Sequence, residues 1–191
     1  EDWDRLAVVL LRRDDFLADD LDARIQNLSD LARVHETRKG ARDAAFFIWA
    51  KAAQIQPSDD LVAAELWRLA QDLGWWTEYV DNLADVVGRM PEEMRQEHLL
   101  RFGDVLWHRA GRPDQAVVWF EKVRKEWAEN ETALAALNEL YRAVGRYEDL
   151  IGVLDAQVEL TPDYLEKVRL ATMAGVVLEA EPLRQLIEGS F

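Results

Sequence analysis

The stretch ETALAALNELYRAVGRYEDLIGVLDAQVELTP, residues 131–162, has the clearest pattern of two paired helices in the sequence. Its first half repeats apolar residues at a helical spacing, with Leu134, Leu137 and Leu140 on one face. Gly145 follows, and a glycine at this place permits the left-handed backbone that ends a helix. The second half carries another apolar stripe, made of Tyr147, Leu150, Leu154 and Val158. We therefore expect two helices joined by a tight turn.

The same turn signal recurs along the chain. Glycines stand at positions 40, 74, 111 and 145, and Pro57 and Pro91 follow the same spacing. A period of about 34 residues, with glycine between paired helices and proline at the end, indicates a stack of helical hairpins.

A longer period, twice the length of one hairpin, lies on top of the shorter one. Leu66, Gly74 and Trp76 recur one such period later as Leu137, Gly145 and Tyr147. The sequence therefore predicts a building block of two successive hairpins.

This pattern resembles the tetratricopeptide repeat. That family has apolar residues at positions 4 and 7, an aromatic residue at 11, glycine near 15, a second aromatic residue at 17 and proline at 32. The matching residues of the clearest unit are Leu134, Leu137, Tyr141, Gly145, Tyr147 and Pro162. The resemblance covers residues 26–164 and places repeats at 26–59, 60–96, 97–130 and 131–164. It implies an all-α, right-handed superhelical solenoid of antiparallel helix pairs.

Both ends of the chain are expected to hold partial repeats. Residues 1–22 resemble the second helix of a preceding repeat, because Trp3, Leu6 and Leu10 match Tyr147, Leu150 and Leu154. Residues 165–191 are expected to be a partial or capping repeat, with a helix over 164–180 and a short partner over 182–187. We interpret the chain as part of a longer tetratricopeptide-type protein, with a bacterial origin and a cytoplasmic location favoured.

Composition limits the possible functions. The net charge is −14, and a strongly acidic chain repels nucleic-acid phosphates and anionic membrane surfaces. No apolar run approaches the roughly 18 residues that a membrane span needs. The chain has no cysteine, and its three histidines lack metal-site spacing. The nucleotide-binding and hydrolase motifs are absent as well. We therefore expect neither an enzyme nor a cofactor.

Two groups of residues allow more than one interpretation. The doublets Asp14-Asp15, Asp19-Asp20 and Asp59-Asp60 could bind a cation, but solvated helix ends are favoured, with Asp59 or Asp60 as an N-cap.

Four tryptophans, at positions 49, 67, 76 and 107, occupy positions assigned to the core. Three others, at 75, 119 and 127, could anchor a partner or pack between repeats, and packing is favoured.

The resemblance also implies a ligand groove along the first helix of each repeat, at positions 2, 5, 9, 12 and 13. In this sequence the positions are Asn27, Asp30, Val34, Thr37 and Arg38; Leu61, Ala64, Arg68, Gln71 and Asp72; His98, Arg101, Val105, His108 and Arg109; Thr132, Ala135, Glu139, Arg142 and Ala143; and Glu166, Arg169, Met173, Val176 and Val177. Their formal charge is +2, which leaves −16 on the rest of the chain.

Two functions remain open. A locally basic groove would bind an acidic protein or peptide segment, because arginine forks hold carboxylates well. The partner-binding residues of this scaffold or adaptor would be Arg68, Arg101, His108, Arg109 and Arg142. Alternatively, the arginines pair with neighbouring acids such as Asp72 and Glu139, and the chain is a structural spacer or self-association module.

Overall fold

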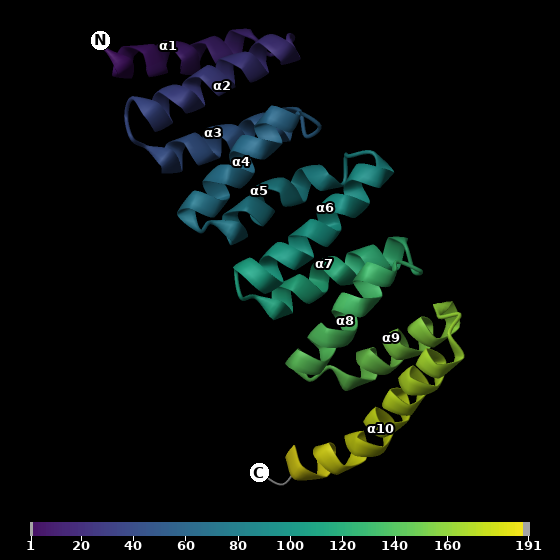
Figure 1. Ribbon diagram of the computed structural model, residues 1–191. Helices are drawn as coiled ribbons and strands as arrows, with labels where there is room; N and C mark the ends of the chain where they lie inside the picture. The colour runs from purple at the N-terminus through teal and green to yellow at the C-terminus, as the bar shows by residue number, and fades with distance from the viewer. Residues whose placement is uncertain (1, 189–191) are drawn as a thin grey trace. The chain divides into compact units, whose positions relative to one another are not determined.

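The chain folds entirely into helices over the part that is described. The computed structural model describes the backbone of residues 2–188 and the side chains of residues 2–177, and it contains no strand within that part (Figure 1). The helices are α1 (Trp3–Phe16), α2 (Leu21–Thr37), α3 (Arg42–Ile55), α4 (Asp60–Leu73), α5 (Trp76–Val87), α6 (Glu92–Asp104), the π-helical turn η1 (Val105–Arg109), α7 (Pro113–Glu126), α8 (Glu131–Val144), α9 (Tyr147–Leu160) and α10 (Tyr164–Glu188). The predicted all-α class is confirmed.

The chain divides into two compact units, Glu1–Arg95 and Gln96–Phe191. In the first unit, α1 packs on α2, α2 on α3, α3 on α4 and α4 on α5. In the second unit, η1 packs on α7, α7 on α8, α8 on α9 and α9 on α10. Packing between consecutive helices is the arrangement that a helical repeat array requires.

The turns between paired helices have the predicted left-handed backbone. The φ angles of Gly40, Gly74, Gly111 and Gly145 are 66°, 69°, 63° and 76°. A residue with a Cβ atom is strained in this region, because the Cβ approaches the following carbonyl oxygen. These glycines therefore allow the chain to reverse direction between two helices of a pair.

The longer sequence period reappears in the hydrogen bonds of the turns. In the second and fourth predicted repeats, the backbone N–H after the glycine donates to a carbonyl five residues back. The bonds run from Trp75 to Ala70 and from Arg146 to Tyr141, both at 2.9 Å. These are the tight turns that usually end a helix at a left-handed glycine.

The first and third predicted repeats close with a wider turn. Ala41 N–H donates to the His35 carbonyl at 2.9 Å, and Arg112 N–H donates to the Leu106 carbonyl at 2.7 Å. Each bond spans six residues, one more than in the tight turns. The two kinds of turn alternate along the chain with the longer sequence period, a difference in turn width that the sequence did not predict.

The wide turn changes which residues of the third repeat are buried. Trp107, which was expected in the core, is half-buried, and so is Leu100, whereas Leu99, Phe102 and Leu106 are buried. The π-helical turn η1 adds a residue before the glycine and rotates the apolar stripe relative to the tetratricopeptide frame. Trp107, like Trp67, is therefore half-buried where the sequence predicted a core position.

The other tryptophans pack mainly inside the units. Trp49 and Trp76 are buried, while Trp67 is half-buried with its ring 5.0 Å from the ring of Trp76. Three tryptophans lie outside the main stripes. The ring centroid of Trp75 is 5.4 Å from that of Phe46, and the ring centroid of Trp119 is 5.0 Å from that of Phe102. Trp127 is half-buried. Packing is thus the role that the structure gives to Trp75 and Trp119.

The last helix is longer than predicted. α10 continues as a single helix to Glu188, so the separate short helix expected over 182–187 does not form. Pro182 lies within this helix. A proline removes one backbone N–H donor, so a helix can continue through it at the cost of one hydrogen bond and a local distortion.

The acidic doublets have two different structural roles. Asp20 caps α2 by accepting from Ala23 N–H at 3.0 Å, and Asp59 caps α4 by accepting from Val62 N–H at 2.9 Å. Those two follow the favoured interpretation. Asp14 does not, because its side chain is only 1% exposed.

Asp14 forms a buried ion pair network that joins three helices. Its carboxylate, on α1, accepts from Arg24 of α2 at 2.9 Å and from Lys51 of α3 at 2.6 Å. Burial raises the pKa of the Asp14 carboxyl, but the hydrogen bonds from Arg24 and Lys51 outweigh this effect and leave the pKa below its ordinary value. The network therefore favours the folded state whenever the carboxylate is ionised.

Replacement of Asp14 should loosen α1. We expect Asp14→Ala to lower the free energy of unfolding by about 2 kcal/mol, less than for a fully buried pair, because Lys51 is partly solvated. The folded-state pKa is depressed, so this stabilisation is complete above the ordinary pKa of 3.8 and is lost as the pH falls through the folded value. Urea unfolding from pH 3 to pH 8 measures both effects. The exposed neighbour Asp15→Ala is the control, and equal effects of the two variants would contradict the assignment.

A close helix contact in the second unit depends on Gly103. A Cβ atom added to Gly103 of α6 would lie 2.5 Å from the ring of Phe120 on α7. Real Cβ atoms do not approach ring carbons so closely, so either the Phe120 ring or the two helices must shift to admit one.

Gly103→Ala should therefore lower the free energy of unfolding of the second unit by about 1–3 kcal/mol. Gly175→Ala is the matched control, because an added Cβ there meets nothing within 4 Å and alanine favours a helix by up to about 1 kcal/mol. Chemical denaturation of both variants tests this prediction. A Gly103→Ala protein as stable as the wild type would show that the contact is looser than the structure has it.

Candidate functional site

The five predicted partner-binding residues lie in different surroundings. Arg68 belongs to α4 in the first unit, whereas the other four belong to the second unit. Arg101 and His108 line a hollow between α6, η1 and α8, and Arg142 lines a second hollow between α8, α9 and α10. Arg109 is exposed on η1 and lines neither hollow.

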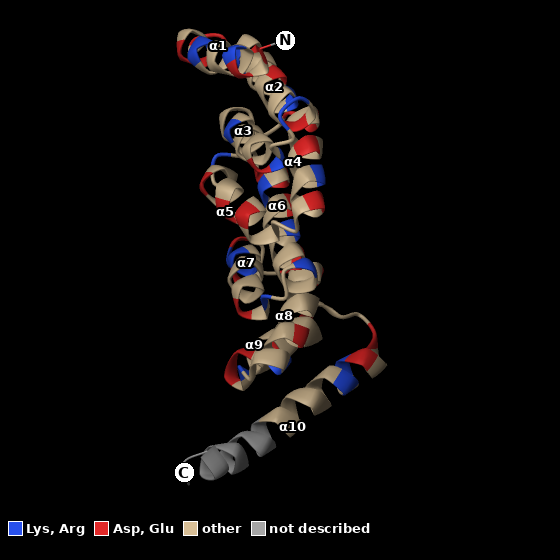
Figure 2. Ribbon diagram, turned by 90° about the vertical axis from the view of Figure 1, so that its left-hand side faces the viewer, with Lys and Arg blue, Asp and Glu red and all other residues tan. Residues whose placement is uncertain are grey.

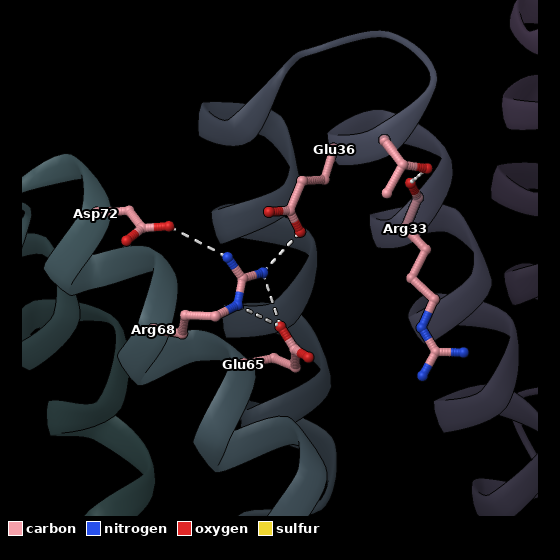
Figure 3. A network of polar contacts seen from close by, with 6 residues as sticks. Arg33, Glu36, Glu65, Arg68 and Asp72 are labelled. Carbon is pink, nitrogen blue, oxygen red and sulfur yellow. Dashed lines mark hydrogen bonds and ion pairs between the residues drawn. The ribbon is translucent and has the colours of Figure 1, made fainter.

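Arg68 is surrounded by carboxylates. Its guanidinium lies 2.7 Å from Glu36, 2.8 Å from Glu65 and 3.2 Å from Asp72. Figure 3 shows these three acids around the guanidinium, with Arg33 pointing away from them. Hydrogen bonds to Glu36 and Glu65 raise the pKa of Arg68, although burial opposes the shift.

Arg68 thus follows the alternative in which arginines pair with neighbouring acids, Asp72 included. One guanidinium faces three carboxylates, so the cluster carries a net negative charge. Figure 2 shows the same arrangement on the ribbon, with a basic segment between acidic ones along α4. The geometry gives Arg68 an internal structural role that links α2 to α4.

Loss of Arg68 should destabilise the first unit through the repulsion of the acids that remain. We expect Arg68→Ala to lower the free energy of unfolding by about 1 kcal/mol, since the group is partly exposed. The loss should shrink in about 1 M NaCl, where charges are screened. Arg33→Ala, on the neighbouring helix, should change stability by less than about 0.5 kcal/mol. Equal stability of the two variants would contradict the structural role.

The first hollow of the second unit combines aromatic and charged side chains. This α6–α8 hollow has a volume of about 530 Å³. Its lining consists of Glu97, Leu100, Arg101, Asp104, Trp107, His108, Phe120, Thr132, Ala135, Ala136 and Glu139. The Trp107 ring stacks on the His108 ring, with their centroids 4.3 Å apart. Arg101 pairs with Glu97 at 2.6 Å, and His108 Nε2 lies 3.6 Å from Asp104.

The second hollow is more polar. This α8–α10 hollow has a volume of about 500 Å³, and its lining consists of Glu131, Leu134, Ala135, Asn138, Glu139, Arg142, Gln157, Leu160, Thr161, Glu166, Arg169, Leu170 and Met173. Arg142 donates to the Asn138 side-chain oxygen at 2.9 Å, and the Asn138 amide donates to Gln157 at 2.7 Å. Arg169 pairs with Glu166 at 2.6 Å.

The two hollows meet on α8. Ala135 and Glu139 line both of them, so together the hollows form one surface, here named the α8 groove. The predicted groove positions that it contains are Arg101, His108, Thr132, Ala135, Glu139, Arg142, Glu166, Arg169 and Met173.

Some predicted groove positions are buried instead. Val34 and Val105 lie in the core of their units, in the two repeats with the wide turn. Asn27 is also buried, and its amide donates to the Leu10 carbonyl at 2.8 Å. The rotated stripe explains why position 9 of the predicted frame faces inward in these two predicted repeats.

The groove contains acids that the predicted positions leave out. Glu97, Asp104 and Glu131 join Glu139 and Glu166, which makes five carboxylates against the guanidinium groups of Arg101, Arg142 and Arg169. With His108 neutral, the lining carries a formal charge of −2. The sequence could have indicated two of these acids. Glu97 stands four residues before Arg101, and Asp104 stands four residues before His108, a spacing that brings the two side chains of each pair together on a helix.

The comparisons with known proteins add no relative. A scan of the chain against protein-family models finds no match, and a search of curated proteins finds no similar sequence. Within the described residues, none of the helices has the length and apolar character to cross a membrane, and no three His, Asp or Glu side chains come together as metal ligands would. The function of this protein must therefore be inferred from the α8 groove itself.

Proposed function

We propose that the protein is a non-catalytic interaction module that holds a segment of a partner protein against α8 of the second unit. The observation that carries this proposal is the meeting of two open hollows, of about 500 Å³ and 530 Å³, on the exposed Ala135 side of α8. Volumes of this size lie in the range of ligand sites, and an elongated groove suits a peptide segment.

The side chains of the groove support recognition. The lining offers apolar contact through Leu100, Phe120 and Leu170, ion pairing through its acids and arginines, and hydrogen bonding through Asn138. Helix-in-groove and extended-peptide interfaces use this combination of an apolar base and a polar rim.

A second candidate function is the structural spacer or self-association module. Apolar side chains are exposed on α1 in the first unit, including Val9, Leu11 and Phe16. Tyr164 and Leu165 are similarly exposed on α10 in the second unit. Exposed apolar surface of this kind favours association between copies.

The groove can be blocked without touching the core, because Ala135 is exposed and lines both hollows. Peptides can be selected from a random dodecamer library on the wild-type protein. They should bind the Ala135→Trp variant at least about tenfold more weakly than the wild type, because the indole would occupy the space that the two hollows share. Isothermal titration calorimetry measures the dissociation constants. Ala143→Trp is the matched control, because Ala143 is an exposed alanine of the same helix that lines neither hollow.

Peptides that bind both variants equally would place recognition outside the α8 groove. If no peptide is selected and sedimentation velocity shows oligomers that depend on protein concentration, the self-association module is favoured instead.

A further inference from the structure

We infer that the partner segment is cationic, and that one of its lysine or arginine side chains enters the α6–α8 hollow toward Glu139. This inference rests on the proposed function and deepens it by naming the chemistry of the occupant. The sequence had predicted an acidic segment, on the basis of the family's groove positions alone. The charges that line the groove favour the opposite sign.

Two acids of the groove are already neutralised. Glu97 pairs with Arg101 at 2.6 Å, and Glu166 pairs with Arg169 at 2.6 Å. Both arginines are therefore held by their own helices, where ion pairs three or four residues apart are favourable. A ligand carboxylate would have to compete with these intramolecular partners.

Other acids remain uncompensated. Glu131 and Glu139 form no ion pair with any described side chain, and Asp104 faces only the imidazole of His108, which is charged only when protonated. Arg142 supplies one positive charge and is hydrogen-bonded to Asn138. Two negative charges are left over, and Glu139 stands where the two hollows meet.

The lining of the α6–α8 hollow also suits a long cationic side chain. Leu100, Phe120 and Ala136 offer apolar contact to an aliphatic stem, while Asp104 and Glu139 can receive the charged head group. Lysine and arginine combine these two parts in one side chain. A glutamate in the same place would approach Glu139 and be repelled.

Trp107 provides a further contact for a cation. The π-helical turn η1 leaves this ring half-buried at the hollow, stacked on His108, rather than in the core. Indole rings attract ammonium and guanidinium groups through their negative π face. π-Helical turns inside α-helices are frequently found at functional sites.

Three nonapeptide pools can test the inference. The pools are fluorescein-labelled, contain only uncharged residues at the other positions and differ only at the centre, which is lysine, glutamate or methionine. Fluorescence anisotropy should show the lysine pool binding the wild-type protein about threefold to tenfold more tightly than the methionine pool, with the glutamate pool weakest. Added salt should remove most of this preference.

Glu139→Gln should reduce the affinity for the lysine pool to about the affinity that the same variant has for the methionine pool. Glu159→Gln is the matched control, because it removes an equal charge from an exposed position of α9 outside the groove. Asp104→Asn, also at an exposed position, should reduce the preference independently. Arg142→Glu should strengthen binding of the lysine pool.

The outcomes separate the inference from the proposed function. If all three pools bind equally and Ala135→Trp prevents their binding, the function stands and the cationic partner is wrong. Tighter binding of the glutamate pool, weakened by Arg142→Glu, would also overturn the cationic partner. If no pool binds the wild-type protein, both the groove function and the inference fail.

Discussion

Each helix pair in this protein depends on one residue with a left-handed backbone between its two helices. At Gly74 and Gly145 the φ angles are 69° and 76°, values at which a side chain beyond hydrogen would strain the backbone. The reversal lets the apolar stripe of one helix meet that of the next. Without it, the two helices of a pair could not pack side by side through their apolar stripes.

The width of that turn decides which side chains are buried. The tight turns of the second and fourth predicted repeats keep the expected stripe, including Leu137, in the core. The wide turns of the first and third repeats add one residue and turn Val34 and Val105 inward. The same rotation leaves Trp107 and His108 beside a hollow. A backbone feature at the helix end therefore sets the chemistry of the groove.

Electrostatics act locally in this strongly acidic chain. Arg68 is held by Glu36, Glu65 and Asp72, and Arg101 is held by Glu97. Arginines that appear available in a list of groove positions are thus already paired within the fold. What remains in the α8 groove is negative charge over an apolar base, which is the basis for a cationic partner.

The all-α class, the left-handed glycine turns and a period of two successive hairpins were predictable from the sequence, whereas the alternation of turn widths and the single helix α10 were not. The predictable features depend on residue spacing and on the conformational freedom of glycine, which are local properties. The sequence also placed Arg101, His108 and Arg142 on first helices that line the groove. The tertiary structure alone decided that Asp14 is buried in an ion pair, that Trp107 leaves the core and that five acids outnumber three arginines in the groove. Burial and charge compensation depend on residues from different helices, and a one-residue shift at a turn changes which of them meet.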